Sequence, residues 1–151
     1  MARSHHRHGL LGLLAIALPL LATSRPPQAT PDLLIVGNDY SFVIPATVRP
    51  GLTTVSFENR GKQLHEMHLV RLKPGITFDS VFKVGPGTSR RALLEFGSGG
   101  ILFAEPGQRA AGQLLMNFEA GRNYMVRCTL QDAPDKPEHV ALGMFGGFKV
   151  R

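Results

Sequence analysis

The chain has 151 residues, a length that allows one ordinary domain with a hydrophobic core. Its single cysteine excludes an intrachain disulfide, and the absence of tryptophan, with 17 glycines and 11 prolines, favours a turn-rich β protein over a helical one. The positive charges are spread along the chain, with no run longer than Arg90-Arg91 and no interleaved aromatic residues. This pattern argues against nucleic-acid binding and fits a mildly cationic face that meets an acidic partner.

The first 32 residues are expected to form a targeting signal and a linker and not to be part of the folded domain. Residues 1–24 have the plan of a secretory signal peptide, with a basic, His-containing head and an apolar run at 9–22. Small residues before the cut place cleavage after Ser24, with a cut after Ala29 as the alternative. The apolar run is short for a bilayer span, although an uncleaved membrane anchor is the other reading. We therefore expect a periplasmic or secreted protein with a linker at 25–32 and no membrane span in the mature chain.

From Leu33 onwards the chain reads as short alternating strands separated by turns. Strands are expected at 33–36, 40–44, 53–58, 64–72, 108–118, 123–130 and 145–150. Thr77 is expected to cap a short helix at 78–84. The segment 88–107 is glycine-rich and is expected to be mostly loop, with one helical turn at 90–95. About seven strands and one short helix predict a β-sandwich.

The stretch from Tyr124 to Met144 contains the three side chains of greatest chemical interest. Cys128 ends a predicted strand, and His139 and Met144 follow a loop rich in proline and aspartate. A thiol, an imidazole and a thioether on one strand-loop-strand unit are the ligand types of a blue-copper site, which takes a second histidine from elsewhere in the fold. His65 is the candidate for it. His68 lies three residues further along the same strand, so only one of these two histidines can face the site.

Each of these residues also has a plain structural interpretation. Cys128 is then an inert buried thiol, His139 a loop residue and Met144 core filler. Other chemistries fit less well. The sequence H-E-M-H at 65–68 is one residue short of the zincin motif and lies on a predicted strand instead of a helix. For a nucleophilic pair of Cys128 and His139, the sequence shows no third orienting group and no evident oxyanion site, so we expect no enzyme.

Several segments together resemble a secreted cupredoxin-like domain over residues 33–151. They are Y-S-F-V-I-P-A-T-V-R-P-G, V-S-F-E-N-R-G, His65, and Y-M-V-R-C with His139 and Met144. The tail H-V-A-L-G-M-F-G is similar to the copper loop of the first domain of copper nitrite reductases, which has the pattern H-V-x-x-G-M and a comparably long gap after its cysteine. The resemblance implies an all-β, Greek-key β-sandwich and copper ligands at His65, Cys128, His139 and Met144.

One residue departs from the family pattern. Glu66 follows His65 where many cupredoxins have asparagine, and a carboxylate there is an alternative ligand. The expected function is a type 1 (blue) copper protein that acts as a small electron carrier with an acidic redox partner. The alternative is a cupredoxin-like module without a redox role, either a structural or binding domain or a copper-delivery protein.

Overall fold

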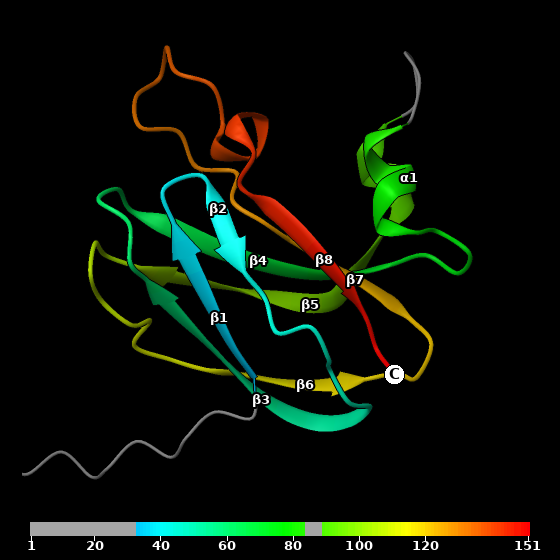
Figure 1. The fold of residues 1–151 in the computed structure, drawn as a ribbon. Helices are drawn as coiled ribbons and strands as arrows, with labels where there is room; N and C mark the ends of the chain where they lie inside the picture. Colours follow the sequence, from blue (N-terminus) through cyan, green and yellow to red (C-terminus); the bar gives the residue numbers. More distant parts are fainter. Residues whose placement is uncertain (1–32, 84–88) are drawn as a thin grey trace, which may run out of the picture.

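The computed structural model describes residues 33–83 and 89–151, which form two packed β-sheets (Figure 1). The elements are β1 (Leu33–Asn38), β2 (Ser41–Val43), β3 (Gly51–Asn59), β4 (His65–Leu72), α1 (Phe78–Phe82), the 3₁₀ turn η1 (Arg90–Leu93), β5 (Leu94–Ala104), β6 (Leu114–Phe118), β7 (Asn123–Arg127), the 3₁₀ turn η2 (His139–Leu142) and β8 (Phe145–Lys149). The predicted signal peptide and linker lie outside the described residues.

One sheet has the strand order β2-β1-β3-β6 and the other the order β5-β4-β7-β8. Within them β1 and β3 run parallel, and the other neighbours are antiparallel. The predicted all-β sandwich with one short helix is thus confirmed, with eight strands in the described part of the chain. Thr77 caps α1 as predicted, through a reciprocal capping box with Ser80. Among the described residues, no helix has the length and apolar character needed to cross a membrane.

The hydrophobic core lies between the sheets and is built by alternating side chains. Fully or almost fully buried residues from both layers include Ile35, Phe57, Leu69 and Val126. A second cluster, which includes Leu72 and Met125, packs beneath α1 on the outer face of the second sheet. Strands β4 and β7 are therefore buried on both faces where they pass beneath α1.

The prediction of a loop at 88–107 is wrong for most of that segment. Residues Leu94–Ala104 form β5, which pairs with β4 along its length. The pairing shifts register between Leu69 and Arg71, where a Cβ at Gly99 would overlap the Leu69 carbonyl oxygen. The glycines thus permit a close backbone approach at a bulge. The turn η1 lies inside the expected helical turn.

Two strands are also shorter than their sequence patterns suggested. The strand expected at 108–118 begins only at Leu114, and the one expected at 123–130 ends at Arg127. Cys128 therefore lies directly after β7, where the chain leaves the sheet. Its side chain still points inward, because it is fully buried together with Val126, the residue two positions before it.

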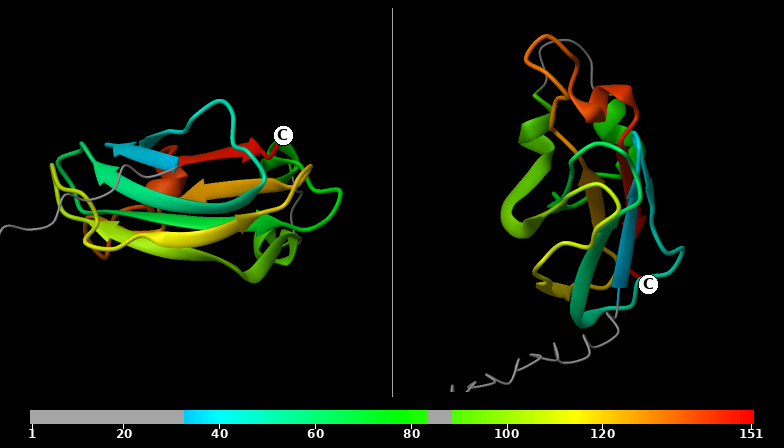
Figure 2. Two further views of the ribbon diagram at one scale, coloured as in Figure 1. Left: turned by 90° about the horizontal axis from the view of Figure 1, so that it is seen from below. Right: turned by 90° about the vertical axis from the view of Figure 1, so that its left-hand side faces the viewer.

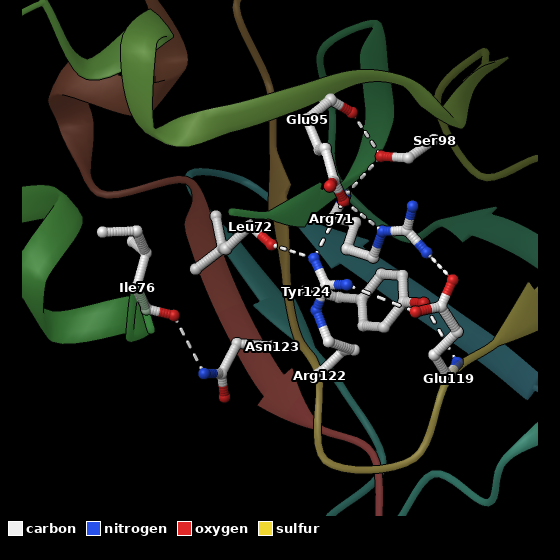
Figure 3. A network of polar contacts seen from close by, with 9 residues as sticks. All are labelled: Arg71, Leu72, Ile76, Glu95, Ser98, Glu119, Arg122, Asn123 and Tyr124. Atoms are coloured by element: carbon white, nitrogen blue, oxygen red, sulfur yellow. Dashed lines mark hydrogen bonds and ion pairs between the residues drawn. The ribbon is translucent and has the colours of Figure 1, made fainter. Parts of the chain in front are cut away.

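A network of ion pairs and hydrogen bonds lies at the end of the second sheet where β7 begins (Figure 3). Arg71 pairs with Glu95 and Glu119, and Arg122 pairs with the same two carboxylates at 2.9 and 3.2 Å. The Arg122 Nη2 that contacts Glu95 also donates to the Leu72 carbonyl oxygen at 2.9 Å. The network joins β4, β5 and the turn between β6 and β7. It lies at the beginning of β7, a full strand length away from the candidate cysteine.

Candidate metal centre

Three of the four predicted ligand residues come together at one end of the sandwich. His65 begins β4, Cys128 directly follows β7 and His139 begins η2. The potential ligand atoms of these three residues lie within 4.8 Å of one another. His139 Nδ1 lies 3.1 Å from His65 Nδ1 and 3.3 Å from Cys128 Sγ. No more than 1% of any of the three residues is exposed, so the group is closed to solvent.

Met144, the fourth predicted ligand, is fully buried and joined to the group through its backbone. The Cys128 N–H donates to the Met144 carbonyl oxygen at 3.1 Å, and the Met144 N–H donates to the His139 carbonyl oxygen at 2.9 Å. The Val140 N–H donates to the Cys128 carbonyl oxygen at 2.8 Å. A Cβ at Gly37 in β1 would lie 3.2 Å from Met144 Cε, so the thioether side chain packs against the other sheet.

The ten-residue gap at 129–138 folds into a compact loop instead of separating Cys128 from His139. The His139 N–H donates to the Leu130 carbonyl oxygen at 2.8 Å and closes the loop at its base. After η2, Gly143 adopts a φ of 106°, a conformation that favours glycine and reverses the chain towards β8. Figure 2 shows the loop and η2 at the end of the molecule opposite the C-terminus.

The turn before β4 fixes the position of His65. The buried side chain of Asn59 donates to the carbonyl oxygens of Gln63 at 2.7 Å and Ala104 at 2.9 Å. Its own oxygen accepts from the Gly61 N–H at 2.8 Å. The turn was expected from the sequence, but this internal bracing was not. Because Asn59 is fully buried and uses both ends of its amide, the chain reaches His65 in one defined direction.

Two carboxylates and a tyrosine that the sequence did not single out surround the histidines. His65 Nε2 lies 3.2 Å from Asp39 Oδ1, and His139 Nε2 lies 2.8 Å from Asp132 Oδ1. The Tyr40 hydroxyl donates to Asp132 Oδ2 at 2.7 Å. Both imidazoles therefore direct Nδ1 into the group and Nε2 towards a carboxylate, the arrangement typical of metal-binding histidines.

Burial sets the protonation of the inner donors. It raises the pKa of the Cys128 thiol, an effect partly offset by the Glu66 N–H that lies 3.4 Å from its sulfur. Burial also lowers the pKa of His65. The backbone N–H of Lys62 holds the pKa of Asp39 below its usual range. Both shifts favour the neutral forms of Cys128 and His65, so metal binding would release the thiol proton.

The outer face of β4 accounts for the two residues left open by the sequence. Glu66 Oε1 accepts hydrogen bonds from the Thr129 N–H and from the Thr129 hydroxyl, both at 2.7 Å. Among the described residues, the group of potential metal ligands contains His65, Cys128 and His139 but not Glu66. Arg127 Nε donates to His68 Nδ1 at 3.4 Å on that same outer face. As expected from strand geometry, His65 alone of the two histidines faces the group.

Comparison with solved structures decides the fold. Auracyanin B aligns with 82% of this chain and 92% of its own, at 15% identity and a TM-score of 0.50. The chain has the cupredoxin fold. Auracyanin A, described as a "blue" copper protein from Chloroflexus aurantiacus, covers 78% of this chain and 96% of its own at 20% identity and a TM-score of 0.45. Reduced auracyanin from Roseiflexus castenholzii covers 78% and 94% at 21% identity and a TM-score of 0.47. No protein-family model and no curated protein matches the sequence.

Proposed function

We propose that this cupredoxin-fold chain is a type 1 (blue) copper protein that acts as a small electron carrier. The proposed ligands are His65, Cys128, His139 and Met144. The proposal is carried by one observation: two imidazole nitrogens and one thiol sulfur, all buried, lie within 4.8 Å of one another. Two histidines, a cysteine and a weakly held methionine are the donor set of blue-copper electron-transfer sites.

The closed construction of the group favours electron transfer over catalysis on a bound substrate. Copper bound there would supply one-electron transfer by cycling between Cu(II) and Cu(I). The chain contributes rigidity, because backbone hydrogen bonds join Cys128, His139 and Met144 to one another. It also excludes water, because all four proposed ligand residues are buried and leave no open face for a substrate. A carrier with this construction needs little rearrangement when its charge changes.

Location and partner form part of the same proposal. The sequence of residues 1–24 supports export to the periplasm or beyond, and removal of Arg3 and Arg7 leaves a mildly positive chain for an acidic redox partner. Beside the buried His139, η2 presents Leu142, which is 44% exposed, as part of an apolar contact surface. The loop with the pattern H-V-x-x-G-M supports a likeness to the first domain of copper nitrite reductases in how it holds its metal.

The test is a visible and EPR spectrum of the purified mature protein with added Cu(II). We expect an intense thiolate-to-copper absorption, which Cys128→Ser abolishes while the fold is kept. The matched control is His68→Gln, because this histidine lies on the outer face of β4 and its loss should leave the colour unchanged. A wild-type protein that stays colourless and binds no copper would instead support a structural, binding or copper-delivery module. Unchanged colour in Cys128→Ser would remove Cys128 from the ligand set.

A further inference from the structure

The outer edge of His139 is covered by a hydrogen-bonded chain of two residues. Asp132 Oδ1 lies 2.8 Å from His139 Nε2, and the Tyr40 hydroxyl donates to the other Asp132 oxygen at 2.7 Å. The Tyr40 ring also stands edge-on to the His139 ring, with 5.2 Å between centroids and an interplanar angle of 76°. Together these contacts leave His139 1% exposed although it lies at the end of the sandwich.

The hydrogen bond to Asp132 determines which nitrogen of His139 carries the proton. An ionised carboxylate only accepts hydrogen bonds, so His139 Nε2 must be the protonated nitrogen that faces Asp132. A neutral imidazole then has its lone pair on Nδ1, the atom that faces His65 and Cys128. The Tyr40 hydroxyl bonds the remaining Asp132 oxygen and fixes the rotation of the carboxylate. The ring is thus oriented, before any metal binds, with the lone pair of Nδ1 directed towards His65 and Cys128.

The backbone of Tyr40 provides a second, independent observation on this contact. Its φ is 61°, and it is the one non-glycine residue with positive φ among the described residues. A bulky side chain in the left-handed region is uncommon and strained. The turn between β1 and β2 would accept glycine or asparagine with less strain. Tyrosine at this position supplies the hydroxyl for Asp132 and a ring that contacts His139.

We infer that Asp132, held by Tyr40, is a positioning residue that presets His139 for metal binding. For its metal part this inference rests on the proposed function. The carboxylate also makes the opposite nitrogen of the ring a more basic ligand. A more basic ligand favours Cu(II) over Cu(I), so Asp132 lowers the reduction potential of the centre. Asp39 is less separable, because its carboxylate also accepts the Lys62 N–H at 2.8 Å and braces the turn before His65.

The experiment compares Asp132→Ala with Asp135→Ala in the full mature chain. Asp135 lies in the same loop, is largely exposed and approaches Lys136 at 3.6 Å, so its replacement makes the same charge change without touching His139. Nitrogen-detected NMR of the metal-free proteins is the first readout. We expect a single Nε2–H tautomer with a slowly exchanging proton for His139 in wild type and Asp135→Ala, and mixed tautomers with faster exchange in Asp132→Ala.

Copper titration and potentiometry are the second readout. We expect Asp132→Ala to bind Cu(II) about tenfold to a hundredfold more weakly and to have a higher reduction potential, while Asp135→Ala stays near wild type. Tyr40→Phe keeps the ring and should shift both quantities in the same direction by less. Asp132→Asn keeps an acceptor oxygen and should restore part of the effect.

The outcomes separate this inference from the proposed function. Wild-type tautomer and exchange in metal-free Asp132→Ala would overturn the positioning role, whatever the copper data show. A wild-type protein with a single His139 tautomer that binds no copper would overturn the proposed function and leave the positioning role standing. If Asp132→Ala does not fold, Asp132→Leu carries the same comparison, because it also removes every acceptor from His139 Nε2, and a wild-type tautomer and exchange rate in that variant would overturn the inference.

Discussion

At Gly61, a missing side chain allows Asp39 to reach His65. A Cβ at this position would overlap Asp39 Oδ1 and would lie 2.8 Å from His65 Nε2. The requirement comes from close approach, since the glycine lies directly over the hydrogen bond between the two side chains. Any other residue would have to displace the carboxylate, the imidazole or the turn that carries both.

We therefore predict that Gly61→Ala weakens both the fold and the metal centre. Overpacking of this kind costs about 1–3 kcal/mol, and His65 should lose its fixed orientation, so that Cu(II) affinity falls at least about tenfold. Gly112→Ala is the matched control, because a Cβ there meets nothing within 4 Å. Urea unfolding and copper titration measure the two effects. Equal behaviour of the two variants would show that the space at Gly61 is not needed.

The sequence pointed to the inner residues of the candidate site but not to the outer ones. Cys128 and His139 share one strand-loop unit, so their residue types and order are visible in the sequence, and His65 is marked by its strand. The structure brings these three together, and their role as ligands stays a prediction. Asp132 meets Tyr40 from 92 residues away. Only the folding of a turn against a distant loop creates that contact, and neither local sequence carries a pattern for it.

At the scale of elements, the wrong prediction concerned a glycine-rich segment. The run Gly97-Ser98-Gly99-Gly100 reads as a loop, but it lies within β5. A Cβ at Gly100 would clash with Leu114, just as one at Gly99 would overlap the backbone of β4. Composition cannot distinguish a glycine needed for flexibility from one needed for close packing. Strands with regular alternation, such as β3 and β7, were placed correctly to within a few residues.

The network that anchors β5 should make stability depend on pH. The hydrogen bond from Arg71 to the Glu95 carboxylate lowers the pKa of Glu95 from its usual value of 4.5, so the folded state favours the ionised carboxylate. That contribution to stability is present above the unfolded value and is lost as the pH falls through the lower folded value. We predict that Glu95→Gln is less stable than wild type at pH 7, with a difference that narrows steadily below pH 4.5.

Thermal unfolding across this pH range measures the effect. Glu105→Gln is the matched control, since Glu105 is an exposed residue just beyond the end of β5. It removes the same charge without touching the network and should follow wild type at every pH. A constant difference between Glu95→Gln and wild type down to strongly acid pH would contradict the assignment to Glu95 ionisation.

At the scale of the whole molecule, the sandwich could be predicted because its cause is distributed along the chain. Alternating apolar residues and frequent turns recur from Leu33 to Val150, and no single error, such as the missed β5, changes the architecture they imply. The proposed export signal at residues 1–24 lies outside the described part and stays a prediction.

Metal binding should stabilise the entire fold, because the donors are assembled only in the folded state. His65, Cys128 and His139 come from separate elements, so the unfolded chain offers no comparable site. With free Cu(II) at a hundred times its dissociation constant, we predict a gain of about 2.7 kcal/mol in the free energy of unfolding. Urea unfolding with and without copper measures it, and a chelator should reverse it. An equal gain in Cys128→Ser would mean that copper stabilises the protein at some other place.

The hydrogen bond between Tyr40 and Asp132 crosses the seam of the sandwich. Tyr40 lies in the turn between two strands of one sheet, whereas Asp132 and His139 lie in the segment between two strands of the other, at the same end of the molecule (Figure 1). Any displacement of one sheet relative to the other would therefore change the distance between Tyr40 and the carboxylate that orients His139. The packing of the two sheets and the orientation of the His139 ring are thus linked through Tyr40 and Asp132.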